Sequence, residues 1–195
     1  MVSEADKDAA FSAAVNGNLP TIAAVIERGM SVNEVDWLGN TLMHLAAIHQ
    51  HVHVIMALLR LGGNPRAKDT EGWTPLHRAA ANCHAASIEA LVHGGASGRD
   101  LDVDRYSPLY VLAMNVSSSA EIAYAALAAI LRCTDNDFTA KDKHGRTAEA
   151  VAREQGANKF KFADKIVEVF AGCLLRLPPL TPSSALFECY GRHGE

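Results

Sequence analysis

A segment of about 33 residues repeats along this chain, and the repeat limits what the chain can fold into. Nine positions recur at one offset of 33 residues between two neighbouring copies. The matched pairs are Asp36 and Asp69, Gly39 and Gly72, Thr41 and Thr74, His44 and His77, Ala46 and Ala79, Ala47 and Ala80, Ile55 and Ile88, Leu58 and Leu91, and Gly62 and Gly95. A period of this length is typical of a solenoid, in which each unit buries its apolar face only against its neighbours.

Each copy reads as a turn followed by two short helices. In the copy that begins at Asp69, Gly72 lies in the turn and Thr74 precedes Pro75. This pair favours a helix start, because a Thr hydroxyl can cap free N–H groups and Pro is tolerated at the first helical position. The period restarts around Leu91, and Gly95 then supplies a left-handed helix stop.

These residues resemble the ankyrin repeat, above all GWTPLH at 72–77 and its echo GNTLMH at 39–44. The resemblance covers roughly residues 8 to 170. It implies an all-α ankyrin-repeat solenoid of about five units including caps, made of stacked helix–turn–helix units with β-hairpin loops. It also implies that His44 and His77 bond locally to the Thr hydroxyl and neighbouring backbone, and that partners dock on the concave face formed by hairpins and first helices.

The repeat predicts the domain organisation. We expect an acidic lead at 1–7, the ankyrin-repeat domain at 8–176 and a Pro-containing tail at 177–195, with units at 8–35, 36–68, 69–101, 102–141 and 142–176. The fourth unit is degenerate. Arg105 stands where Gly72 stood, which puts the tight turn in doubt, and a Ser-rich insertion at 115–121 is expected as a loop between its helices. The fifth unit reads as a closing cap, with a second helix around 162–175.

Composition narrows the class of protein. With 49% hydrophobic and 21% charged residues the chain is typical of a folded domain, and its net charge of −4 gives no case for nucleic acid. The acidic start predicts no signal peptide, and no run of 18 apolar residues predicts a membrane span. Four cysteines without a CxxC pair favour reduced thiols. We therefore expect a monomer in the cytoplasm, with or without the nucleus, and no membrane contact.

Motifs for catalysis are not found. The sequence holds no GxSxG, no HExxH and no phosphate-binding Gly loop, so we expect no enzyme and no cofactor. His49, His51 and His53 alternate, and imidazoles at this spacing can share a metal. The repeat register instead places these histidines at the turn between two helices, where they would shield helix ends. We expect no metal site, and metal binding remains an alternative.

The remaining function is protein–protein interaction, as a scaffold, adaptor or stoichiometric inhibitor. Residues between the repeated positions are free to carry recognition, and the predicted partner-binding set is Trp37, Leu38, Asn40, Thr70, Glu71, Trp73, Asp104, Tyr106, Lys143 and Arg146. Aromatic residues dominate interface hot spots. Trp37 is the better candidate, because Trp at the position of Trp73 is common in the resembled family and can simply cover the hairpin. Acidic turns at Asp102 and Asp104 and basic residues further on favour a partner of mixed charge.

The tail carries the alternative function. Residues 177–195 read LPPLTPSSALFECYGRHGE and fit no repeat. Its prolines stop the preceding helix and favour extended backbone. The LPPL…LFECY run is similar to the end of a SOCS box, a segment that some ankyrin proteins use to reach a ubiquitin ligase, although the rest of that box is not evident. The tail is therefore either loose or folded back, or it makes the chain a targeting subunit of a ubiquitin ligase or kinase complex.

Overall fold

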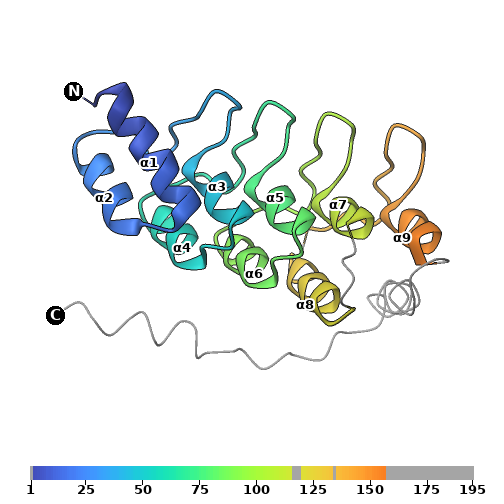
Figure 1. The fold of residues 1–195 in the computed structure, drawn as a ribbon. Coiled ribbons are helices and arrows are strands. Elements are labelled where there is room, and N and C mark those ends of the chain that lie inside the picture. Colours follow the sequence, from blue (N-terminus) through green and yellow to red (C-terminus); the bar gives the residue numbers. More distant parts are fainter. Residues whose placement is uncertain (1, 116–119, 134, 157–195) are drawn as a thin grey trace.

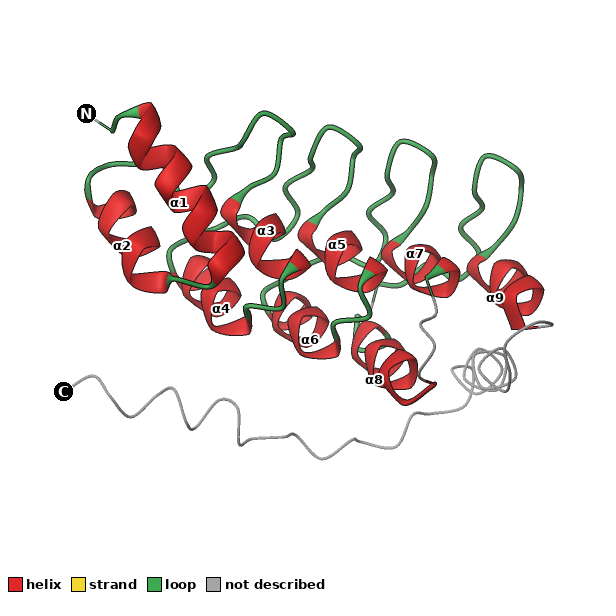
Figure 2. Ribbon diagram, in the orientation of Figure 1, coloured by secondary structure: helices red, strands yellow, loops and turns green. Residues whose placement is uncertain are grey.

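The computed structural model describes residues 2–115, 120–133 and 135–156, and this part of the chain is a stack of short helices. The described residues form nine helices: α1 (Glu4–Asn16), α2 (Leu19–Glu27), α3 (Leu42–Ile48), α4 (Val52–Arg60), α5 (Pro75–Ala81), α6 (Ala85–His93), α7 (Pro108–Met114), α8 (Ala120–Ile130) and α9 (Ala148–Gly156). The first helices α1, α3, α5, α7 and α9 form one row, and α2, α4, α6 and α8 form a second row (Figure 1). Hairpin loops project from the first row (Figure 2).

Each first helix begins at a hydroxyl residue, as the sequence predicts. Thr41, Thr74 and Ser107 are the N-cap residues of α3, α5 and α7. The hydroxyl of Thr74 accepts a hydrogen bond from the backbone N–H of His77, and Pro75 occupies the first helical position. The Thr74 and Ser107 hydroxyls thus satisfy N–H groups that the helix itself leaves unpaired.

Two buried histidines connect neighbouring units. In His77, Nδ1 accepts a hydrogen bond from the Thr74 backbone N–H, which leaves Nε2 to donate to the Tyr106 carbonyl of the next hairpin at 3.0 Å. His44 makes the same pair of bonds, to Thr41 and to the Trp73 carbonyl. Burial lowers the pKa of both rings, and that of His77 to about 4. The local Thr–His bonds implied by the resemblance are confirmed, and each ring in addition bridges to the following unit.

The core is continuous along the stack. Its largest members include Ile22, Ile55, Leu58, Ile88 and Leu91, each with no exposed surface. They come from the second helices of three successive units, so every unit buries its apolar face against the next.

The hairpins share one turn design. The Asp69 carboxylate accepts the backbone N–H groups of Glu71 and Trp73, and Gly72 adopts a left-handed φ of 77°. In the fourth unit Asp102 accepts two N–H groups in the same way, and Arg105 takes the left-handed conformation with φ 66°. The tight turn is therefore kept without glycine. Within the described hairpins the pairing is limited to isolated bridges, such as Val35 with Thr41.

The N-terminal end of the array differs from the predicted boundary. Helix α1 begins at Glu4, with Ser3 as its cap, so most of the predicted lead at 1–7 belongs to the first helix. Ion pairs join Asp6 to Arg28 and Lys7 to Glu34. The structure places the insertion of the fourth unit between α7 and α8, where residues 116–119 are not described. The predicted helix around 162–175 and the tail at 177–195 also lie outside the described residues.

Candidate functional site

Backbone hydrogen bonds join the hairpins into a row. The backbone N–H of Thr70 donates to the Leu38 carbonyl at 3.0 Å, and the Thr70 hydroxyl donates to the same oxygen at 2.9 Å. The N–H of Val103 donates to the Glu71 carbonyl at 3.2 Å. The hairpins and first helices therefore present one preassembled surface, which we call the hairpin face. Leu38, Thr70 and Glu71, from the predicted binding set, all lie on it.

The second unit contributes the most apolar hairpin. Trp37 is 86% exposed, Val35 is 53% exposed and Leu38 is 40% exposed. Large apolar side chains of this kind are normally buried, and their accumulation at one place marks an interaction surface. The structure therefore places two of the predicted residues, Trp37 and Leu38, side by side and open to solvent.

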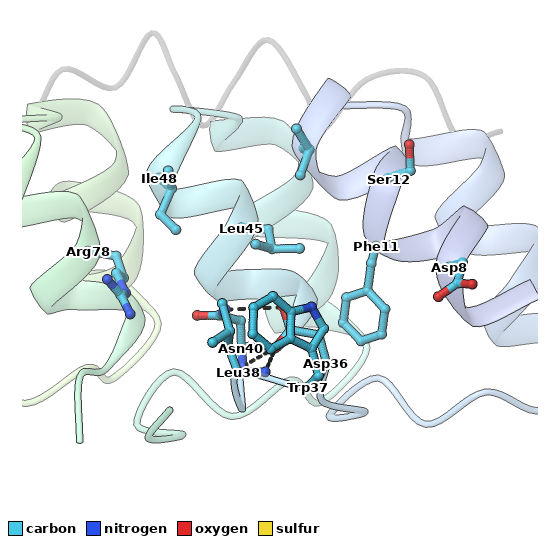
Figure 3. A pocket seen from close by; sticks show the side chains of 11 residues that line it. Asp8, Phe11, Ser12, Asp36, Trp37, Leu38, Asn40, Leu45, Ile48 and Arg78 are labelled. Atoms are coloured by element: carbon cyan, nitrogen blue, oxygen red, sulfur yellow. Dashed lines mark hydrogen bonds between the residues drawn. The ribbon is translucent and has the colours of Figure 1, made fainter. Parts of the chain in front are cut away.

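A groove of about 460 Å³ lies beside Trp37. Helix α1 supplies Phe11, and α3 supplies Leu45 and Ile48 as the apolar lining. In Figure 3 the Trp37 ring lies next to Phe11, with Leu45 and Ile48 beyond it. The polar lining residues are Asp8, Ser12, Asp36, Asn40 and Arg78. We call this site the Trp37 groove.

Asp8, Phe11 and Leu45 were not among the predicted binding residues. Leu45 carried a usable signal, because the same position in the next unit is Arg78. An apolar residue at a position where a neighbouring unit places a charged one does not belong to the shared core. Phe11 and Asp8 carried no such signal, since the first unit has no matching hairpin in the repeat.

Trp73 has a structural role that Trp37 lacks. Its indole N–H donates to the Asp102 carboxylate at 2.9 Å, and the Arg78 guanidinium lies 4.7 Å from the centre of its ring. The ring therefore packs across two hairpins. Of the two interpretations of Trp73, the structure supports the one in which the side chain covers the hairpin.

Asn40 was expected to be free of packing, and this expectation is wrong. Its side chain belongs to the interior, with the residue only 4% exposed. The amide group donates to Asp36 Oδ2 at 3.1 Å, while its Oδ1 atom has no hydrogen-bond partner in the described residues. The position equivalent to Trp73 is thus a buried polar one in the second unit, at the edge of the Trp37 groove.

Asp102 was expected to be a surface charge, and this expectation is also wrong. The residue is 8% exposed and accepts hydrogen bonds from two backbone N–H groups and from Trp73. Burial raises the pKa of this carboxyl group, while the hydrogen bonds act in the opposite direction. Asp102 therefore holds the turn together and is not available to attract a partner.

The acidic and basic hairpin residues pair with each other. Lys143 lies 2.7 Å from the Asp104 carboxylate, and Arg146 contacts Asp142 and Glu154. Their fields largely cancel, which weakens the prediction of a mixed-charge partner. Tyr106 is half-buried, and its ring stacks on that of Tyr110 with centroids 4.5 Å apart. Lys143 remains on the exposed hairpin face.

The alternating histidines connect two units. His51 Nε2 bonds to the Val15 carbonyl at 2.8 Å, and His53 Nε2 bonds to the Gly17 carbonyl at 2.9 Å. These bonds occupy carbonyls at the end of α1. Among the residues described, no group of three or more His, Cys, Asp or Glu side chains could hold a metal ion. Over the same residues, no helix has both the length and the apolar character needed to cross a membrane.

The geometry defines a helical repeat array with a hairpin face, and the comparison with protein families agrees. The family model described as ankyrin repeats (3 copies) matches residues 10–102. Residues 10–102 are therefore ankyrin repeats, and α7, α8 and α9 continue the same architecture beyond the matched segment. A search of the curated proteins finds no match to this chain. Ankyrin repeats are in general protein–protein interaction modules, and the family is typically non-enzymatic.

Proposed function

We propose that this chain is a non-enzymatic binding module whose protein partner contacts the hairpin face, with Trp37 at the centre of the contact. The observation that carries the proposal is the 86% exposure of Trp37 beside an apolar groove. Tryptophan gives a large contact area for few rotatable bonds and is enriched at interface hot spots. A scaffold, an adaptor and a stoichiometric inhibitor would all use such a surface.

The comparison between the two tryptophans supports this choice. Trp73 is held by Asp102 and by Arg78, so its place on the hairpin is explained by packing. Trp37 makes no side-chain hydrogen bond or ring contact among the described residues. Its exposure therefore costs free energy in the isolated chain, and burial against a partner would recover that free energy.

Affinity capture from cell lysate tests the proposal with Trp37→Ala beside a matched control. Val103→Ala is the control, because Val103 occupies the position equivalent to Trp37 in the hairpin of the fourth unit and is 70% exposed. We expect a protein that is retained by wild type and by Val103→Ala and lost by Trp37→Ala, with unchanged melting curves for all three. Equal retention by all three proteins would rule out Trp37 as the centre of the contact.

The targeting role of the tail is the second candidate. Residues 177–195 lie outside the described part of the chain, so this role is supported only by the LPPL…LFECY sequence. A chain shortened to residue 176 separates the two candidates. Loss of the captured protein from the shortened chain, with retention by Trp37→Ala, would favour the tail.

A further inference from the structure

The hairpin of the second unit, residues 36–40, differs from the others in what lies on its N-terminal side. The hairpins of the third and fourth units each bond to the hairpin before them, through the N–H groups of Thr70 and Val103. In the described residues, helix α1 rather than another hairpin lies on the N-terminal side of the second unit's hairpin (Figure 1). The Trp37 groove occupies the space between them, lined by Phe11 of α1 and Trp37 of the hairpin.

The apolar part of the groove can receive one large side chain. Phe11, Trp37, Leu45 and Ile48 line it from three elements of the chain (Figure 3). Its volume of about 460 Å³ falls within the range of roughly 300–1,000 Å³ that small-ligand sites have. The aliphatic and aromatic part of this lining favours a Leu, Met or Phe side chain.

Asn40 adds an unsatisfied acceptor to this lining. The orientation of its amide is determined by Asp36, because a carboxylate oxygen accepts only from the NH₂ group. Oδ1 is therefore the atom left without a partner in the described residues. A buried acceptor without a donor costs free energy, and most such groups in folded proteins are paired. Because Oδ1 is itself buried, this cost belongs to the second unit, and the atom is not exposed to an occupant of the groove.

The charges around the groove favour an occupant that carries a basic group. Asp8 is exposed and makes no ion pair with the described residues, whereas Asp6 and Lys7 beside it are paired. Among the lining residues of the described groove, Arg78 is the cation, and it is already held by the Asp69 and Glu71 carboxylates. The groove is thus negative at the Asp8 end and has no cation left to balance it.

We propose that the Trp37 groove binds an extended segment of the protein partner that carries a large apolar side chain and a neighbouring Lys or Arg. The apolar side chain packs between Phe11, Trp37 and Leu45. The basic group pairs with the Asp8 carboxylate. This inference rests on the proposed function, because it names the chemistry of a partner at the same surface.

A randomised peptide library displayed on phage provides the probe, selected on the full chain and counter-selected on Trp37→Ala. We expect the enriched sequences to place Lys or Arg within two positions of Leu, Met or Phe. Enrichment of acidic sequences, or of apolar sequences without a basic residue, would overturn the proposal. Failure to enrich any sequence on wild type over Trp37→Ala would overturn it as well.

Titration of an enriched synthetic peptide then tests the individual contacts. We expect Trp37→Ala to weaken binding by at least about tenfold, as for an interface hot spot. Asp8→Asn should weaken it by about threefold, as for an exposed ion pair, and should reduce the dependence of affinity on salt. Glu27→Gln is the matched control, since Glu27 is an exposed carboxylate at the end of α2, and it should change neither quantity.

The lysate experiment separates this inference from the proposed function. One outcome is that capture depends on Trp37 while the peptide selection shows no preference for basic and apolar residues. That result would support the proposed function and refute the chemistry assigned to the partner. Capture that does not depend on Trp37 would refute both. An enriched peptide whose affinity is equal for wild type and Asp8→Asn would refute the assigned ion pair.

Discussion

The Tyr110 hydroxyl donates a hydrogen bond to Asp142 Oδ2 at 2.5 Å, and this bond joins the fourth unit to the fifth. Tyr110 occupies the position that His44 and His77 hold in the two preceding units. Those histidines bond to a backbone carbonyl of the next hairpin, whereas Tyr110 bonds to the carboxylate that organises the turn. The degenerate fourth unit therefore keeps the connection between units and changes its chemistry.

Removal of this hydroxyl should weaken the C-terminal end of the array. We expect Tyr110→Phe to lower the free energy of unfolding by about 1–3 kcal/mol, because it leaves a buried carboxylate with one donor fewer. Urea denaturation of the full chain measures the change. Tyr106→Phe is the matched control, since the Tyr106 hydroxyl makes no hydrogen bond within the described residues, and it should cost less than about 0.5 kcal/mol. Equal effects of the two substitutions would contradict the role of Tyr110.

Buried His77 predicts a stability that depends on pH. Burial lowers its pKa from the ordinary value near 6.5 to about 4, so between these values the unfolded chain binds a proton that the folded chain does not. Stability should therefore fall as the pH drops from about 6.5 to about 4, by roughly 3 kcal/mol from this group. The ring Cε1–H resonance of His77 in an NMR titration gives the most direct measurement. A midpoint near 6.5 would show that the ring is not buried as described.

Arg105 predicts a stabilising substitution. Arg105 has a left-handed φ of 66°, which strains a residue that has a Cβ atom but does not strain glycine. We expect Arg105→Gly to raise the free energy of unfolding by about 0.5–1 kcal/mol, reduced by the loss of the contact from Arg105 Nε to the Lys141 carbonyl.

Two glycines provide the controls for that experiment. A Cβ on Gly145, which has a φ of 78°, would meet no atom within 4 Å, so Gly145→Ala should cost about 1 kcal/mol from backbone strain alone. A Cβ on Gly72 would lie 3.0 Å from the backbone nitrogen of Val103, so Gly72→Ala should cost more. A neutral Gly145→Ala, measured by thermal melting, would show that φ at this position does not limit stability.

The middle of the stack should be sensitive to the loss of a core side chain. Leu91 has no exposed surface, and Leu91→Ala should cost about 2–5 kcal/mol. Leu61 is 50% exposed at the end of α4, and Leu61→Ala should cost less than about 0.5 kcal/mol. Similar costs for the two substitutions would mean that the repeat register places the wrong residue in the core.

The sequence predicts those structural features that depend only on residues within one unit. The Thr74 cap and the buried position of Leu91 follow from residues within one unit, and the structure confirms them. Contacts between units are different, because they join residues about 29 to 37 positions apart. The bond from Trp73 to Asp102 is such a contact, and apart from the resemblance to the ankyrin repeat nothing within one unit distinguishes a packed Trp73 from an exposed Trp37.

The candidate site was predictable in part for the same reason. Exposed Trp37 and Leu38 stand out as apolar residues in a turn, whereas the contribution of Phe11 depends on how α1 lies beside the second hairpin. Burial of Asn40 likewise depends on the packing of its neighbours. Arg105 shows a third limit, since the hydrogen bonds of the Asp102 turn outweigh the backbone cost of a missing glycine.

The dissociation constant of the captured partner, measured with wild type, Trp37→Ala and Val103→Ala, tests the central claim most directly. If the partner buries Trp37 at the centre of its interface, Trp37→Ala should weaken binding by about 2 kcal/mol or more, which is roughly 30-fold. Val103→Ala should then change the constant by less than about threefold. A constant that is the same for wild type and Trp37→Ala would contradict the claim that this surface is the binding site.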